Sequence, residues 1–289
     1  MNIRIFQKGF NYSQDGTGNR LVYHLQGCNM RCPWCANPEG ISSKGTLIAN
    51  DALLVDSVCP YGAIRNKQID RDKCAECSSK ECISVNKNLG IRFSCEEYDI
   101  DSVIDEAMQC SPLFFNGGGV TLTGGEPTTQ FEAVKEFLGK LKNKGIHTAI
   151  ETNATHPMLE MLFPLIDMLI MDFKHYDRTI HTKITGVDNV IIKENTGKAL
   201  SFHKRVLIRI PVIKEFNDSE NDIMNFVAFF KQYETQNAVF EFLPYHEYGK
   251  AKWLQCGMHY NMGDAFIEPE TLTKYRKHFI NNNLITVET

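Results

Sequence analysis

The stretch Gly27-Cys28-Asn29-Met30-Arg31-Cys32-Pro33-Trp34-Cys35 carries three cysteines, separated by three and then two residues. Three thiolates on one loop can each bind an iron of a [4Fe–4S] cube, which has four irons. The next cysteine is Cys59, so one iron is left open to a ligand that is not a protein side chain. A structural zinc site is the alternative, but zinc needs four closed ligands.

Strand and helix patterns alternate along most of the chain. Helices are predicted from Thr128 or Thr129 to Gly145 and after a cap at Asp218 or Ser219. Alternation of this kind predicts parallel βα units in an open sheet or a barrel, and six strands are too few for an eightfold barrel. The predicted strands are residues 21–25, 120–123, 146–151, 168–171, 206–210 and 239–243.

Residues 46–93 interrupt this alternation. They contain four cysteines, scattered charges and few long apolar runs. We therefore expect a small cluster-bearing domain at 46–93, inserted into a main domain formed by residues 1–45 and 94–289. Such a segment has too little apolar surface to fold unaided, so bound metal must supply part of its stability.

Composition and charge exclude several classes of protein. The 289 residues are 43% hydrophobic and 23% charged, which is ordinary for a globular protein. No apolar run approaches the ~18 residues of a membrane span, and the first residues lack the apolar core of a signal peptide. A net charge of −4 without basic blocks disfavours a nucleic-acid partner. We expect a cytoplasmic monomer without a membrane partner.

Cysteine usage also points to metal. Seven of the ten cysteines fall within the 55 residues from Cys28 to Cys82. In a cytosolic chain, dense cysteines at short spacings favour metal sites, and disulfides are the alternative.

The motif Cys28-x3-Cys32-x2-Cys35, with the aromatic Trp34, resembles the signature of radical S-adenosylmethionine (SAM) enzymes. The wider sequence resembles the activating enzymes of glycyl radical enzymes, the pyruvate formate-lyase activating enzyme-like family, in its subgroup with a ferredoxin-like cluster insertion. The other matching stretches are Asp15-Gly16-Thr17-Gly18-Asn19-Arg20, Gly117 to Pro127, Asp172-Phe173-Lys174 and Leu243 to Lys250.

This resemblance implies a fold, an activity and cofactors. The fold class is α/β, a partial (β/α)6 radical SAM barrel. A flavodoxin or ferredoxin reduces the cluster at Cys28, Cys32 and Cys35, and SAM then yields a 5′-deoxyadenosyl radical. The radical takes a hydrogen atom from a backbone glycine of a partner glycyl radical enzyme. No side chain is expected to act as an acid or base.

Polar motifs follow the predicted strands, and the carboxyl ends of parallel strands share one face. Gly124 and Gly125 can let backbone approach SAM, and Glu126 can accept a hydrogen bond from its ammonium group. Trp34 or the Ala36 backbone can lie against adenine. The resemblance assigns the SAM carboxylate and ribose to Lys174, Arg209 and His246, includes Phe173 in the site, and suggests a monovalent cation near Glu151, Thr152 and Asp172.

The cysteines of the insertion can build one auxiliary [4Fe–4S] cluster. Cys59 precedes a proline and joins Cys74-x2-Cys77-x4-Cys82, as in ferredoxin motifs. Related activators often carry eight cysteines here, so this chain departs from them. Cys95 is the substitute fourth ligand, and zinc is the alternative metal.

The insertion favours a partner other than pyruvate formate-lyase, such as a diol dehydratase, a decarboxylase or a C–N or C–S lyase. Two other functions stay open at this point. One is a radical SAM enzyme acting on another peptide or a small molecule. The other is a non-enzymatic iron–sulfur electron carrier, which leaves the motifs at 124–126 and 172–174 unexplained.

Overall fold

The computed structural model describes residues 1–54, 59, 61–77, 79–85 and 90–288. Within them, one sheet of nine strands forms the centre of the molecule. In spatial order its strands are β13 (Thr286–Val287), β12 (Ala238–Pro244), β11 (Val206–Val212), β10 (Met168–Asp172), β9 (Thr148–Thr152), β8 (Gly119–Gly124), β2 (Asn19–Leu25), β1 (Asn2–Tyr12) and β7 (Glu96–Asp99).

The strands from β2 through β8 to β12 are parallel neighbours. They coincide with the six predicted strands, so the predicted α/β partial barrel is confirmed. Apolar side chains cover both faces of the curved sheet. One core packs the strands against the outer helices, and a smaller inner core holds Ala149, Met168, Ile170 and Leu207.

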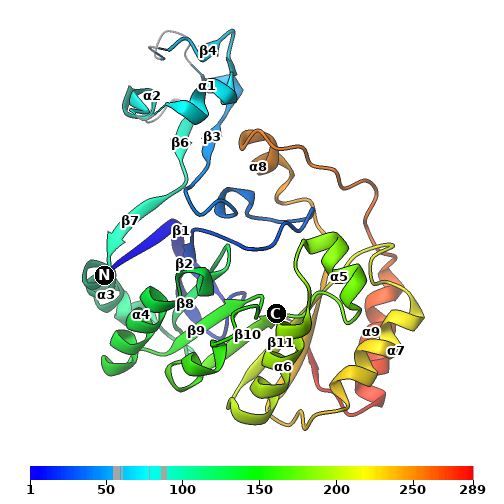
Figure 1. Cartoon of the computed structure of the whole chain (residues 1–289). Helices are drawn as coiled ribbons and strands as arrows, with labels where there is room; N and C mark the ends of the chain where they lie inside the picture. The colour runs from blue at the N-terminus through cyan, green and yellow to red at the C-terminus, as the bar shows by residue number, and fades with distance from the viewer. Residues whose placement is uncertain (55–58, 60, 78, 86–89, 289) are drawn as a thin grey trace.

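Helices cover the outer face of the sheet (Figure 1). The predicted helix after Ser219 is α7 (Glu220–Phe230), and its capping box and buried stripe agree with the sequence pattern. The predicted helix ending near Gly145 is α4 (Phe131–Asn143), preceded by a 3-10 turn at Pro127–Gln130. The outer helices are α3 (Ile100–Cys110), α4 (Phe131–Asn143), α5 (Arg178–Thr185), α6 (Val190–Phe202), α7 (Glu220–Phe230) and α9 (Pro269–Asn281).

Strands β1 and β7 were not predicted. β1 pairs antiparallel with β2 on one side and with β7 on the other. Ile3 and Ile5 are buried, but most of the strand from Gln7 onward is exposed. A strand with so little buried surface gives no period-two pattern.

Two of the glycine-rich stretches meet at the amino ends of β2 and β8. Gly18 has φ +72°, and a Cβ there would lie 2.4 Å from the Phe115 carbonyl oxygen. Arg20 is fully buried and donates to the Thr121 hydroxyl at 2.6 Å and to the Val120 carbonyl at 2.7 Å. These residues therefore join two strands at the end of the barrel opposite to the cysteine loop.

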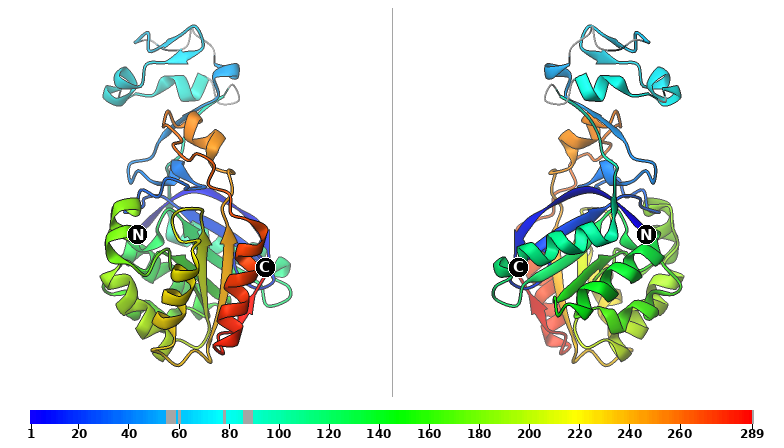
Figure 2. Two further views of the ribbon diagram at one scale, coloured as in Figure 1. Left: turned by 90° about the vertical axis from the view of Figure 1, so that its right-hand side faces the viewer. Right: turned by 90° about the vertical axis from the view of Figure 1, so that its left-hand side faces the viewer.

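The cysteine-rich segment projects away from the barrel (Figures 1 and 2). It leaves and returns through the antiparallel pair β3 (Leu47–Ala49) and β6 (Ile91–Phe93). Beyond this pair lie the hairpin β4 (Ile64–Arg65) and β5 (Gln68–Ile69) and the short helices α1 (Arg71–Glu76) and α2 (Glu81–Val85). Its own core is small: Ala49, Leu54, Ile64, Cys82 and Ile91. None of the described helices is long and apolar enough to cross a membrane.

Candidate functional site

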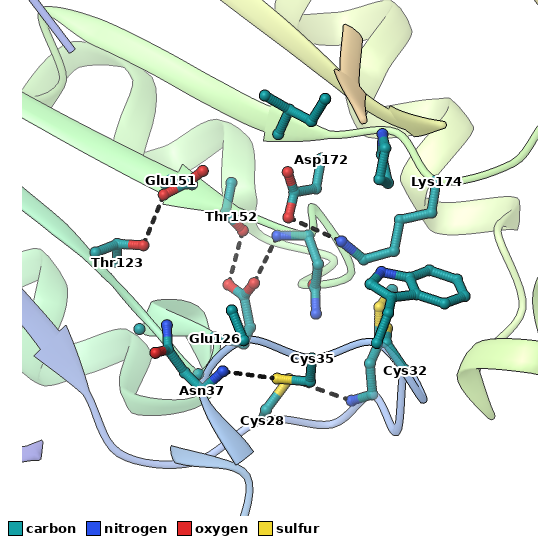
Figure 3. Close-up of a pocket in the computed structure, with 18 of the residues that line it drawn as sticks. Cys28, Cys32, Cys35, Asn37, Thr123, Glu126, Glu151, Thr152, Asp172 and Lys174 are labelled. Atoms are coloured by element: carbon teal, nitrogen blue, oxygen red, sulfur yellow. Dashed lines mark hydrogen bonds and ion pairs between the residues drawn. The ribbon is translucent and has the colours of Figure 1, made fainter. Parts of the chain in front are cut away.

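A cavity of about 250 Å³ opens at the carboxyl ends of the parallel strands (Figure 3). It brings together segments that are more than 200 residues apart in the sequence. The predicted site residues that line it are Cys28, Cys32, Trp34, Cys35, Ala36, Gly124, Gly125, Glu126, Glu151, Thr152, Asp172, Lys174 and His246.

The three-cysteine loop follows β2, and backbone hydrogen bonds join the start of the loop to the residues that follow it. The Gly27 amide donates to the Gly40 carbonyl at 2.8 Å, and the Cys28 amide donates to the Ile41 carbonyl at 3.0 Å. The amides of Met30 and Asn37 donate to Sγ of Cys28 and Cys35, both at 3.4 Å. Such hydrogen bonds to sulfur are one of the means by which proteins tune iron–sulfur clusters.

Desolvation in the cavity wall raises the pKa of the Cys28 and Cys35 thiols to about 12, and it also raises the pKa of Cys32. Without metal these thiols are therefore protonated near neutral pH, and metal binding releases their protons. Three soft sulfur donors on one loop fit an iron–sulfur cluster.

Lys174 places an ammonium group next to the thiols. Its Nζ lies 2.8 Å from Oδ2 of Asp172, and its side chain is only 10% exposed. Desolvation by itself would lower the pKa of Lys174, but the Asp172 carboxylate raises it above its usual value. The lysine is therefore charged, and its ammonium group can bind a negatively charged or polar group in the cavity.

Glu126 is buried and joins the ends of β8 and β9. Its Oε1 accepts hydrogen bonds from the amide and hydroxyl of Thr128 and from the hydroxyl of Thr152, at 3.0, 2.5 and 2.7 Å. Its Oε2 accepts the Asn153 amide at 2.6 Å. Burial raises the pKa of Glu126 despite these bonds.

Gly124 and Gly125 line the cavity, but their immediate neighbours are protein backbone. A Cβ at Gly124, where φ is +119°, would lie 2.4 Å from the amide nitrogen of Leu25. A Cβ at Gly125 would lie 2.3 Å from the Gly27 carbonyl oxygen. The absence of side chains therefore first serves the close packing of β8 against the cysteine loop.

Arg209 and Phe173 are not brought into the cavity wall. Arg209 is buried between two carboxylates, with Nη1 2.5 Å from Glu151 and Nε 2.8 Å from Glu241. Phe173 is 1% exposed and stacks on Phe229 in the outer core. A residue in the middle of a motif, such as Phe173, can thus point away from the cavity that its two neighbours line.

Sequence reasoning missed several parts of the wall. Asn37 follows the cysteine motif and Tyr245 precedes His246, and both line the cavity. Their positions directly beside predicted site residues were a signal that could have identified them. Trp34 packs against Phe216, with ring centroids 5.0 Å apart, and His246 stacks on Tyr248 at 4.2 Å.

A second cavity, of about 360 Å³, lies in the insertion and is lined by Cys59, Cys74, Cys77 and Cys82. The amides of Ala63 and Lys80 donate to Sγ of Cys59 and Cys77, at 3.3 and 3.4 Å. Burial, together with the other three thiols, raises the pKa of Cys74, whereas the Lys80 amide lowers the pKa of Cys77.

Cys95 does not belong to the described wall of this second cavity. Its Cβ lies instead against Gly45, which is part of that wall. Across the described residues, no three His, Cys, Asp or Glu side chains are close enough together to hold a single metal ion.

Comparison with known proteins gives consistent matches. The family model of the radical SAM superfamily matches residues 22–227. The chain is 33% identical to the 4-hydroxyphenylacetate decarboxylase activating enzyme of Clostridioides difficile (strain CD196), over 93% of this chain and 90% of the relative. It is also 33% identical to the isethionate sulfite-lyase activating enzyme of Desulfovibrio desulfuricans, over 87% of this chain and 85% of the relative.

Among solved structures, a domain of a pyruvate-formate lyase-activating enzyme from Bacteroides vulgatus has a TM-score of 0.50 and 25% identity. The match covers 59% of this chain and 98% of that domain. The matched part of the chain therefore shares its fold with a solved domain of an activating enzyme.

We predict that Glu126→Gln destabilises the protein by about 1–3 kcal/mol. The amide group of glutamine would have to face a buried N–H or O–H donor, whichever way it is turned. Thermal unfolding of the iron-loaded protein measures the effect, with the exposed Glu132→Gln on α4 as the matched control. Equal unfolding temperatures for both variants would contradict this role of the Glu126 carboxylate.

Proposed function

This chain belongs to the activating enzymes of glycyl radical enzymes within the radical SAM superfamily, and we propose the roles of its site residues and the class of its partner. It is an enzyme that uses a [4Fe–4S] cluster and SAM to generate a glycyl radical in a partner enzyme. This membership rules out the alternative of a non-enzymatic electron carrier.

One observation supports the assignment of the site. Three thiols and the Lys174 ammonium line a single cavity at the strand ends. We propose that Cys28, Cys32 and Cys35 hold the cluster and leave one iron for the amino and carboxylate groups of SAM. When SAM is bound and the cluster is reduced, the two cofactors together supply a 5′-deoxyadenosyl radical that removes a hydrogen atom from a glycine of the partner.

The other residues bind and orient SAM. The Lys174 ammonium faces the carboxylate of SAM, and the Glu126 carboxylate accepts a hydrogen bond from its amino group. Among the described residues, Oε2 of Glu126 accepts one hydrogen bond, which leaves a lone pair available. Trp34 or the Ala36 backbone packs on adenine, and His246 binds the ribose. Arg209 acts indirectly, by fixing Glu151.

A monovalent cation near Glu151, Thr152 and Asp172 is supported by the side chains there. The carboxylates of Glu151 and Asp172 line the same cavity as Thr152. Their oxygen atoms are ligands of the kind that a monovalent cation binds. We therefore expect SAM to bind more weakly when tetramethylammonium replaces sodium and potassium, as measured by equilibrium binding. Equal affinity in both salts would exclude the cation.

We propose that residues 46–93 form a separate domain with one auxiliary [4Fe–4S] cluster. The shared cavity and the two N–H···S bonds support Cys59 as the fourth ligand beside Cys74, Cys77 and Cys82. Zinc held by the same thiols is the alternative.

The insertion supports a partner other than pyruvate formate-lyase. Relatives named for a decarboxylase and for a sulfite-lyase are equally identical to this chain, at 33% each. We propose a partner from the decarboxylases, C–N or C–S lyases or diol dehydratases, with flavodoxin or ferredoxin as the electron donor. We also propose a monomer in the cytoplasm, where thiols stay reduced. A glycyl radical signal on a candidate partner, measured by electron paramagnetic resonance (EPR), tests each choice.

We predict that Cys32→Ala abolishes formation of 5′-deoxyadenosine after anaerobic reduction with SAM, because two cysteines cannot hold the cube. The protein should keep about four irons, those of the insertion. Cys110→Ala, at the end of α3, is the control and should keep full activity. Cleavage of SAM by the Cys32→Ala protein would refute the assignment of the site.

Iron content tests the insertion separately. The reconstituted chain should hold about eight irons, and a variant with Cys74, Cys77 and Cys82 changed to Ala about four. Cys59→Ala should lower occupancy of the auxiliary site, whereas Cys95→Ala should not. The opposite result would make Cys95 the ligand, and zinc in place of iron would remove any redox role.

A further inference from the structure

Helix α8 (Lys250–Gln255) lies between the insertion and the barrel (Figures 1 and 2). On its barrel side it holds the three-cysteine loop. The indole Nε1 of Trp253 donates to the Cys35 carbonyl at 2.8 Å. The ammonium of Lys252 donates to Asn37 Oδ1 at 2.8 Å and lies 2.9 Å from the carboxylate of Glu39, which is 1% exposed.

On its other side, α8 is held by the insertion. Arg71, the first residue of α1, donates from Nη2 to the Gln255 carbonyl and from Nη1 to the Leu47 carbonyl, both at 2.7 Å. The last carbonyls of a helix have no partner within the helix, so Arg71 caps α8. Arg71 also lines the insertion cavity and lies one turn before Cys74.

Each end of α8 carries a glycine at a point of close approach. A Cβ at Gly249 would lie 2.3 Å from the Cys35 carbonyl oxygen, on the loop side. A Cβ at Gly257, where φ is +71°, would lie 1.9 Å from Nε of Arg71, on the insertion side. The helix is thus fitted closely to both neighbours, and a shift of one is transmitted to the other.

We propose that α8 couples the filling of the cysteine site in the insertion to the order of the loop that holds the SAM-binding cluster. Arg71 is the positioning residue of this coupling. The proposal rests on the proposed metal site in the insertion. Metal bound by Cys74 and Cys77 fixes α1 and hence the guanidinium of Arg71. An insertion without metal loses that anchor, because its own core is small.

The order of the loop matters for SAM, because Cys35 and Asn37 both line the cavity in which SAM is proposed to bind. Couplings between two sites within a protein are typically worth 5–150-fold in affinity. We therefore expect an effect of about tenfold on SAM binding when the contact of Arg71 with α8 is lost.

The test uses the full, anaerobically reconstituted chain and three measurements: iron content, hydrogen–deuterium exchange of residues 28–41, and the Kd for SAM. Arg71→Ala should keep about eight irons. Its loop should exchange faster, and its Kd should rise about tenfold. The Cys74/Cys77/Cys82→Ala variant should show the same changes with about four irons. A protein that carries Arg71→Ala together with the three cysteine changes should show no faster loop exchange and no higher Kd than the triple cysteine variant alone.

Matched variants separate coupling from general damage. Arg71→Lys can keep one of the two carbonyl bonds and should give a Kd and a loop exchange rate between those of Arg71→Ala and the unchanged protein. Arg65→Ala changes another arginine of the insertion, exposed on β4, and should change nothing. Gly249→Ala should disorder the loop, whereas Gly263→Ala, which has open space around it, should not.

Two outcomes would overturn the coupling or its premise, and they are distinguishable. If the triple cysteine variant keeps four irons and its loop exchanges as in the unchanged protein, the insertion is not coupled to the loop. If the unchanged protein holds only about four irons and no other metal, the proposed site in the insertion fails instead.

Discussion

The cysteine loop has little secondary structure of its own, and it depends on backbone contact with the end of β8. The Gly125 amide donates to the Leu25 carbonyl at 2.9 Å, and the Glu126 amide donates to the Gly27 carbonyl at 2.7 Å. These bonds bring two backbone segments of the chain so close together that there is no room for side chains between them. Glycine therefore occupies positions 27, 124 and 125. The register of β2 and β8 therefore decides where the thiols point, and the remaining wall of the cavity is arranged around them.

The chain has a weak net charge, yet several charged side chains are buried inside the barrel as ion pairs. Arg209 lies between Glu151 and Glu241, and Lys174 pairs with Asp172 on the neighbouring strand. Removing such groups from water is costly unless each finds a partner of opposite charge. The pairs keep polar side chains in fixed positions within an apolar barrel, so the cavity is already shaped to receive a charged ligand.

The sequence was most informative where the signal is local. The six parallel strands, the cap at Ser219 and the buried stripe of α7 follow from periodicity and short-range chemistry. The strand ends also identified most of the cavity wall. The carboxylate partners of Arg209, and the bonds of Glu126 to Thr152 and Asn153, could not be predicted, because they join strands that meet only in the folded structure. β1 was missed because few of its side chains are buried, and the contact between Arg71 and α8 joins residues 184 positions apart.

The insertion enters and leaves through two strands that are direct neighbours, with Leu47 opposite Phe93. Its two ends are therefore about as close together as the ends of an ordinary hairpin. A gene could gain or lose the whole segment and replace it with a tight turn, while the barrel strands keep their order and register. Such a replacement would leave the barrel intact but would remove the contact between Arg71 and the Gln255 carbonyl at the end of α8.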